Sequence, residues 1–313
     1  MSRATIAVFG DLLYDCFIWS DRLPRVGETV TGYASGFFAS GKGGNQAAVC
    51  AKIGAEVYML GKVGSDERGD FLLETMRGAN VNVDGVIVDP VHPTGTDCVL
   101  VAKDGHNAIV VAPNANATVT SEEVEGMRSY FERAQVAVFQ LQINTDAVEH
   151  AMKLAKDCGC RVVLNPAPAC EIPDSMFALA DFVTPNETEA EFFTHIYQAD
   201  FPMEVWREKA AKALHDRGAG TVIITMGEHG AYYSGPEGAF MMPAFKIEPV
   251  DSTAAGDAFN GGLAVSLAEG KPIREAMRVG SACGAITTTR RGSLPSLPTA
   301  DELTEFLNNH TEV

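Results

Sequence analysis

The sequence predicts an α/β fold with a doubly wound, mostly parallel central sheet flanked by helices and a small additional β-sheet. Short apolar runs alternate with helical stretches along most of the chain, which gives βαβ units and a sheet covered on both faces. The chain has 313 residues, 46% hydrophobic and 21% charged, enough for one large core. Two segments rich in turn residues interrupt the alternation and indicate the additional sheet.

The expected elements of the main sheet follow from the apolar periodicity. Helices are predicted over 43–53, 66–78, 146–156, 202–217 and 256–269, with further helical patterns over 277–286 and 301–312. Right-handed crossovers place the connecting loops, and hence a ligand, at the carboxyl ends of the parallel strands. Those strands are predicted over 5–10, 57–61, 136–141, 161–165, 182–185 and 221–226.

The two interrupting segments are 21–39 and 94–114. In the second, the apolar runs 96–102 and 108–111 flank an Asp-Gly pair, which is typical of a β-hairpin. Extra antiparallel strands beside a parallel sheet indicate a small lid. We therefore expect a single domain over 1–313, with a discontinuous lid formed by about 11–39 and 94–114.

Composition and charge limit the partners and the compartment. A net charge of −17 repels phosphate backbones and anionic lipids, so we expect neither a nucleic-acid nor a membrane partner. No apolar run approaches the ~18 residues of a membrane-spanning helix, and the first residues lack a secretory signal pattern. Seven irregularly spaced cysteines indicate reduced thiols. These observations predict a cytoplasmic protein that binds small molecules.

The segment 251–262 joins a turn of small residues to the start of a predicted helix. At Ala254, Ala255 and Gly256, backbone N–H groups can approach an anion closely. A carboxylate in the first helical turn, Asp257, can accept a substrate proton beside that anion. Phosphoryl transfer needs both features. The alternative is that Asp257 only stabilises the positive end of the helix dipole.

The segment 40–47, Ser-Gly-Lys-Gly-Gly-Asn-Gln-Ala, is a Gly-rich loop that opens a helix. It matches neither Gly-x-Gly-x-x-Gly nor Gly-x4-Gly-Lys-Ser/Thr. Its backbone amides, the Asn45 amide and the Lys42 ammonium are hydrogen-bond donors that suit a polyhydroxylated ligand. A tight turn before a helix is the alternative interpretation.

Two further segments follow predicted strands. In Asn186-Glu-Thr-Glu189, the side-chain oxygens suit Mg²⁺ held mainly through waters, although the same pattern is a helix capping box. The glycine turn from Thr225 through Gly227 to Gly230 is suited to line a nucleotide pocket, or simply joins two strands of a hairpin.

Taken together and in this order, these segments resemble the ribokinase-like (PfkB-type) family of carbohydrate kinases. The resemblance covers essentially the whole chain, from Gly10-Asp-Leu-Leu-Tyr-Asp15 through Asn165-Pro-Ala-Pro168 to the segment 289–296. It implies a ribokinase-like fold and ATP-dependent phosphorylation of a sugar hydroxyl. The forms of the segments at 41–47 and 254–257 are most similar to the ribokinase branch, which implies D-ribose as acceptor and ribose 5-phosphate as product.

The resemblance also assigns roles to individual residues. It implies Asp257 as catalytic base, with an anion hole formed by the amides of Ala254, Ala255 and Gly256. The acceptor is bound by Asp15, Gly41, Lys42, Asn45, Gln142 and Asp257. ATP is bound by Asn186, Thr225, Gly227, Gly230 and Gly256, and Glu189 acts on Mg²⁺ indirectly. A K⁺ activator is held, largely through backbone carbonyls, by Asp251, Thr253, Thr287, Arg290, Gly292 and Ser296. The resemblance also implies a homodimer formed through the lid.

Two departures from the family pattern leave the acceptor open. Gln142 stands where ribokinases usually carry Glu, and Ser40 stands where they usually carry Gly. Another pentose, a hexose, a nucleoside or a sugar phosphate are therefore alternative acceptors. A nucleoside needs an aromatic shelf, for which the candidates are Phe17, Trp19, Phe37 and Phe38, and a sugar phosphate needs cations near Lys42. A non-catalytic binding protein is the remaining alternative, although it would be expected to have lost Asp257.

Overall fold

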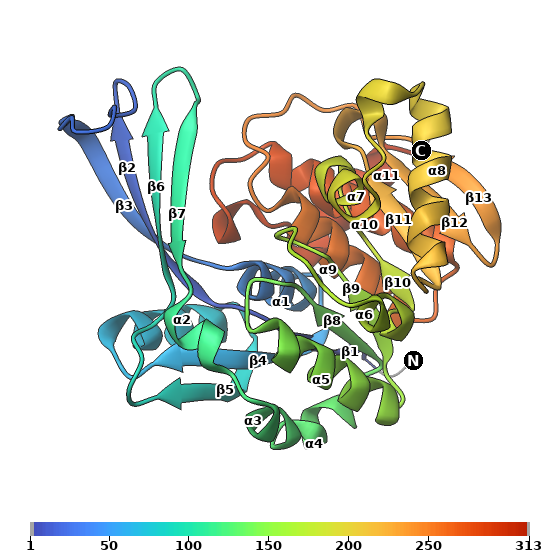
Figure 1. Cartoon of the computed structure of the whole chain (residues 1–313), viewed down its shortest axis with the longest axis horizontal. Helices are drawn as coiled ribbons and strands as arrows, with labels where there is room; N and C mark the ends of the chain where they lie inside the picture. The colour runs from blue at the N-terminus through green and yellow to red at the C-terminus, as the bar shows by residue number, and fades with distance from the viewer. Residues whose placement is uncertain (1–2, 312–313) are drawn as a thin grey trace.

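The computed structural model describes residues 3–311 and contains one large and one small β-sheet (Figure 1). The large sheet has nine strands in the order β13-β12-β11-β10-β9-β8-β1-β4-β5. The strands from β11 to β5 pair in parallel, whereas β12 and β13 are antiparallel additions at one edge. The bounds are β1 Thr5–Phe9, β4 Glu56–Gly64, β5 Asn82–Asp89, β8 Val136–Phe139, β9 Arg161–Leu164, β10 Phe182–Val183, β11 Thr221–Thr225, β12 Ala231–Gly235 and β13 Gly238–Met242.

Helices cover both faces of the large sheet because its strands are apolar on both sides. Along β1, Phe9 packs into one apolar cluster with helices α3 to α8, and Val8 packs into another with α1, α2, α9 and α10. The predicted doubly wound architecture is thus confirmed. The helices are α1 Lys42–Lys52, α2 Glu67–Gly78, α3 Ser121–Glu125, α4 Arg128–Phe131, α5 Thr145–Asp157, α6 Asp174–Leu179, α7 Glu187–Thr194, α8 Met203–Asp216, α9 Ala255–Ala268, α10 Ile273–Thr288 and α11 Ala300–Asn309.

Helix α9 is held tightly between α1 and α10. A Cβ atom on Gly261 would collide with the Val49 side chain of α1. A Cβ atom on Gly262 would lie 2.9 Å from Cys283 Sγ of α10. Since real Cβ atoms essentially never come this close, only glycine permits this packing. The position of the α9 N-terminus is therefore fixed by its neighbours on both sides.

The small sheet stands beside the main body (Figure 1) and has the strand order β3-β2-β6-β7. Its strands are β2 Leu13–Ser20, β3 Gly32–Ser40, β6 Thr96–Ala102 and β7 Asn107–Ala112. The hairpin predicted from its Asp-Gly turn is confirmed, because β6 and β7 pair antiparallel around that turn. The β2–β3 pair is also antiparallel, whereas β2 and β6 run in parallel.

Some elements were not expected from the sequence. Strand β5 was not predicted, because its alternating polar residues give a weak apolar run. Strand β13 was not predicted either, and the helix expected over 301–312 ends at Asn309, with residue 312 outside the described part. Within residues 3–311, no helix has the length and apolar character needed to cross a membrane.

Candidate active site

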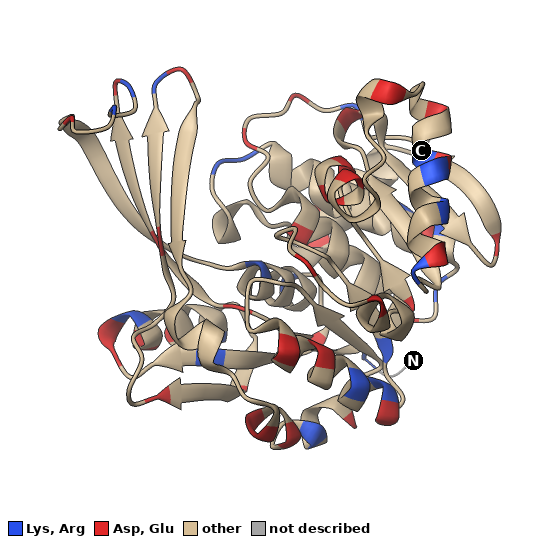
Figure 2. Ribbon diagram, in the orientation of Figure 1, with Lys and Arg blue, Asp and Glu red and all other residues tan. Residues whose placement is uncertain are grey.

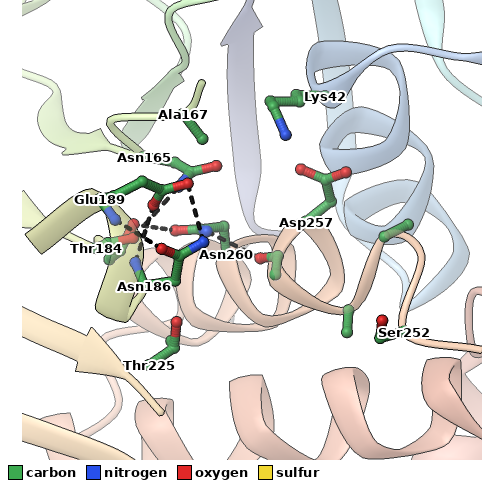
Figure 3. Close-up of a pocket in the computed structure, with 13 residues that line it drawn as sticks. Lys42, Asn165, Ala167, Thr184, Asn186, Glu189, Thr225, Ser252, Asp257 and Asn260 are labelled. Carbon is green, nitrogen blue, oxygen red and sulfur yellow. Dashed lines mark hydrogen bonds between the residues drawn. The ribbon is translucent and has the colours of Figure 1, made fainter. Parts of the chain in front are cut away.

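A cavity of about 190 Å³ lies where β9, β10 and β11 end and α9 begins (Figure 3). This is the carboxyl edge of the parallel sheet, where ligands of open α/β folds bind. Most of its lining side chains are polar, and Lys42 is its only cation. The lining residues are Lys42, Asn165, Ala167, Thr184, Asn186, Glu189, Thr225, Ser252, Ala254, Ala255, Gly256, Asp257 and Asn260.

Asp257 lies in the first turn of α9 and is only 7% exposed. Asn45 Nδ2 donates a hydrogen bond to its Oδ2 at 2.9 Å, and Gln46 Nε2 donates to its Oδ1 at 2.9 Å. Burial raises the pKa of Asp257, while the charge of Lys42 and the two amide donors act in the opposite direction. The carboxylate is thus held in place and has a higher proton affinity than an exposed aspartate.

A chain of buried amides fixes the orientation of Gln46. Gln140 Nε2 donates to Gln46 Oε1 at 2.6 Å, so the oxygen of Gln46 is committed. Its nitrogen therefore faces Asp257 Oδ1 and also Asn165 Oδ1, at 2.9 and 3.0 Å. Gln46 and Gln140 are fully buried. The sequence did not indicate this support, because the two glutamines are 94 residues apart and meet only in the fold.

The turn at the start of α9 lines the cavity through Ala254, Ala255 and Gly256. Ala254 precedes the helix in the left-handed conformation, with φ of 60°. The Ala255 N–H donates to Ser252 O at 3.2 Å, whereas Gly256 lies in the first turn, where helical amides lack an intrahelical acceptor. A Cβ atom on Gly256 would meet nothing within 4 Å. The cavity wall is therefore open at this residue.

Asn186 and Glu189 line the cavity and also cap α7. Glu189 N donates to Asn186 Oδ1 at 2.8 Å, and Asn186 N donates to Glu189 Oε2 at 2.9 Å. The capping-box interpretation is thus confirmed, and it coexists with a position on the cavity wall. Glu189 is 8% exposed, and burial is the main cause of its raised pKa. Its oxygens and those of neighbouring amides are hard ligands of the kind Mg²⁺ accepts.

Five lining residues were not singled out as site residues from the sequence: Asn165, Ala167, Thr184, Ser252 and Asn260. Asn165 and Thr184 directly follow β9 and β10, and Asn260 lies one turn after Asp257 in α9. Thr184 Oγ1 donates to Asn260 Oδ1 at 2.6 Å, and Asn260 Nδ2 donates to Gly256 O at 2.9 Å. The sequence did contain signals for three of them: Asn165 and Thr184 are polar residues at the ends of predicted strands, and Asn260 follows Asp257 by three residues in a predicted helix.

The residues predicted to bind the acceptor lie in several places. Lys42 points toward the same space as Asp257 in Figure 3. Gly41 alone separates the end of β3 from the start of α1, with φ of 97° and no room for a Cβ atom beside Asp11. Asp15 lies on β2 of the small sheet. Gln142 lines a second, largely apolar cavity of about 290 Å³, together with Val111, Pro113, Ala117, Leu141, Ile143, Asn144 and Pro168.

The residues predicted to bind ATP cluster around the end of β11. Thr225 lines the first cavity and forms a bridge with Asn186. Gly227 and Gly230 flank the turn that follows, with φ of 49° and 89°. At Gly230 a side chain would collide with Met242 O, so this turn requires glycine.

The residues predicted to hold K⁺ lie on two adjoining segments: Asp251 and Thr253 on the loop before α9, and Thr287, Arg290, Gly292 and Ser296 from the last turn of α10 onward. Asp251 joins them, because its Oδ1 accepts from Thr253 N at 2.9 Å and its Oδ2 accepts from Gly292 N at 3.0 Å. Arg290 N donates to Thr287 O at 3.3 Å, and Ser296 Oγ donates to Ser293 O at 2.6 Å. In the described part of the chain, no group of three or more His, Cys, Asp or Glu could hold a metal.

Comparison with known proteins decides the family. The model of the pfkB family of carbohydrate kinases matches residues 3–300. The chain belongs to this family. As a pfkB-family member it is an ATP-dependent carbohydrate kinase, in agreement with a polar cavity whose wall carries the buried Asp257 carboxylate in the first turn of α9.

Individual relatives of this pfkB-family kinase align over nearly its full length. It is 36% identical to a ribokinase of Haemophilus influenzae, covering 98% of this chain and 99% of the relative. It is 32% identical to a deoxyribokinase of Salmonella typhi, covering 97% and 98%. The structure of Arabidopsis thaliana ribokinase complexed with ribose and ATP superposes with a TM-score of 0.89 at 27% identity, covering 98% of this chain and 99% of that one.

Proposed function

We propose that this kinase transfers the γ-phosphoryl group of ATP to the primary hydroxyl of D-ribose, with Asp257 as general base. The contact that carries the proposal is the buried Asp257 carboxylate, held by Asn45 and Gln46 beside the α9 N-terminus. The choice of ribose is supported by the names of full-length relatives, several of which are ribokinases.

In the proposed mechanism, the site residues act by position and charge. The acceptor hydroxyl lies against Asp257, whose raised pKa suits it to accept the proton as the oxygen attacks phosphorus. The Gly256 N–H and its neighbours stabilise the negative charge on the transferred group. Lys42, the only cation among the described residues that line the cavity, adds a positive charge. Transfer then needs little covalent chemistry from the protein beyond this alignment.

Two cations complete the proposal. Mg²⁺, when bound with ATP, neutralises phosphate charge, and the oxygens of Glu189 and Asn186 suit it directly or through water. K⁺ is proposed for the segment before α9 and the segment after α10, which hydrogen bonds to Asp251 hold next to each other. Replacing K⁺ by Na⁺ in the assay is expected to lower the rate, and an unchanged rate would remove K⁺ from the scheme.

The decisive experiment measures ADP release with a panel of acceptors. D-Ribose, 2-deoxy-D-ribose, other pentoses, hexoses and nucleosides are compared by kcat/KM, with ATP hydrolysis in the absence of acceptor as the control. The proposal expects D-ribose to rank first among neutral sugars. A higher value for 2-deoxy-D-ribose would reassign the acceptor, and ATP turnover that no acceptor stimulates would overturn the proposed function.

A nucleoside is the second candidate, and one observation favours it. Phe17 stacks on Trp19 with ring centroids 5.6 Å apart, and Phe38 meets Phe17 edge-on at 5.4 Å, giving an aromatic surface on the small sheet. The expectation that Phe37 belongs to this surface is wrong. Its ring stacks on Tyr14 instead, because neighbouring residues of β3 point to opposite faces.

We further propose that the small sheet is a lid and that it mediates a homodimer. The face opposite the aromatic surface carries a row in register formed by Phe37, Cys16, Cys98 and Val110. Phe37 and Val110 at its ends are 55% and 74% exposed, and exposed apolar surface of this kind marks contact sites. Val110→Asp should yield monomers in light scattering, whereas a wild-type chain that is already monomeric would refute the dimer.

A further inference from the structure

The small sheet carries an unusual pair of acidic residues. All residues of its four strands are described, and their only charged side chains are Asp15 and Asp97. Figure 2 shows the other charges of this sheet gathered at its turns. The two aspartates are directly opposite each other, on the parallel strands β2 and β6. Two charged carboxylates in this position would destabilise a sheet, and the two side chains share a hydrogen bond.

Both carboxylates are buried and incompletely paired. Asp15 is 4% exposed and Asp97 is 9% exposed, and neither forms an ion pair in the described structure. Asp15 Oδ1 and Asp97 Oδ1 have no hydrogen-bond partner there. Burial and the neighbouring charge of Asp97 raise the pKa of Asp15 to about 8. A buried acceptor left without a donor is costly, so a ligand that supplies donors would gain from filling this position.

The pair lies on the face of the small sheet that also carries Val111 and Phe38. Asp97 is in register with Val111 of β7, and residues in register point to the same face of a sheet. Val111 lines the second cavity together with Gln142, which follows β8. On the other side, Asp15 is in register with Phe38, so an aromatic ring lies next to the carboxylates on this face.

We propose that Asp97 is an acceptor-binding residue and that the Asp15–Asp97 pair selects a sugar carrying a protonated amino group over the corresponding neutral sugar. The inference rests on the proposed kinase function and narrows its substrate class. An ammonium group donates three hydrogen bonds and satisfies both carboxylates, whereas a hydroxyl donates one. The adjacent aromatic surface also favours a cation. D-Ribose is still expected to rank first among neutral sugars, and the proposal adds that an amino sugar is preferred over its neutral counterpart.

The test compares acceptors that differ only in this group. Pairs such as D-ribose with 2-amino-2-deoxy-D-ribose, and D-fructose with 1-amino-1-deoxy-D-fructose, are measured by kcat/KM and by calorimetric binding without ATP. At least one amine should exceed its neutral partner by about tenfold or more, the value of one charge-assisted hydrogen bond. Amines that bind no better than their neutral partners in every pair would overturn the proposal.

The variant Asp97→Asn should bring the amine-to-neutral ratio of kcat/KM, and the same ratio of binding constants, back toward one, whatever its effect on the neutral sugar alone. Asp104→Asn is the matched control, because it removes one charge from the exposed turn of the same hairpin and should leave the ratio unchanged. Equal ratios in wild type and Asp97→Asn would refute the role of Asp97. Because binding is measured without ATP, a chain that binds amines but phosphorylates nothing would contradict the kinase function and support the pair.

Discussion

Replacing Asp257 by Asn removes the proposed base and preserves the shape of the side chain. Proton transfer to a positioned carboxylate contributes roughly 10²–10⁴ in rate, so we expect turnover to fall by that factor. At 1.36 kcal/mol for each tenfold change, this corresponds to about 2.7–5.4 kcal/mol of transition-state stabilisation. Since the acceptor's other contacts are unchanged, its KM should change much less than kcat.

The structure also predicts the effect of Asp257→Asn on stability. The new amide donor must find an acceptor, and Asn45 Oδ1, which has no partner, becomes available if the Asn45 amide turns over. Gln46 keeps its orientation because Gln140 holds its oxygen. The substitution also removes a buried charge that burial disfavours. An unmet donor costs about 1–3 kcal/mol, and these two effects offset it, so the melting temperature should change little.

The assay follows ADP release with ATP and acceptor saturating, alongside thermal unfolding of each variant. Asp301→Asn is the matched control, because Asp301 also lies in the first turn of a helix but is exposed and remote from the cavity. If Asp257 only stabilised its helix, both variants would keep their turnover and lose a similar, small amount of stability. Near-normal turnover in Asp257→Asn would refute the assignment of the base.

Three further predictions follow from the packing and charge of the site. Gly256→Ala should lower kcat/KM for ATP at least about tenfold, because misplacement of the bound phosphate by about 1 Å costs that much or more. The same substitution should raise the free energy of unfolding by about 0.5–1 kcal/mol. A variant that loses both activity and stability, or gains both, would contradict this prediction. Gly261→Ala should destabilise the fold by about 1–3 kcal/mol through overpacking against Val49, and an unchanged midpoint in urea would show that α1 and α9 can separate freely. Burial raises the pKa of Asp11 to about 7 and is the main cause of the pKa of about 8 for Asp15. The folded state therefore holds protons that the unfolded chain has lost, so these two groups should lower the stability as pH rises from about 4 to 8. Asp15→Asn should flatten that fall in thermal melts.

The sequence predicted the parallel sheet well because both faces of the sheet are covered, which makes its strands near-continuous apolar runs. It predicted β5 poorly because an edge strand alternates polar and apolar residues and resembles a loop. The turn chemistry of the 103–107 segment was specific enough to place a hairpin. Short-range patterns therefore predicted elements wherever burial or turn geometry constrained the residue types strongly.

The sequence predicted the parts of the candidate site whose residues are close together in one continuous segment. Asp257 and the small residues before it form such a segment, and they line one cavity. The amide chain through Gln140 and Gln46 was not predictable, because it joins the end of β8 to α1 across the sheet. The pairing of Asp15 with Asp97 was likewise hidden, because the register between two strands 82 residues apart is set by the fold.

The single residue between β3 and α1 has a thermodynamic consequence. Gly41 alone separates β3 of the small sheet from the helix bearing Lys42 and Asn45, so if the small sheet moves as the proposed lid, its swing would also move that helix. Binding of the sugar and binding of the nucleotide would then both depend on the same equilibrium between two positions of the small sheet. Linkage requires the coupling to be reciprocal: the factor by which sugar tightens nucleotide binding equals the factor by which nucleotide tightens sugar binding.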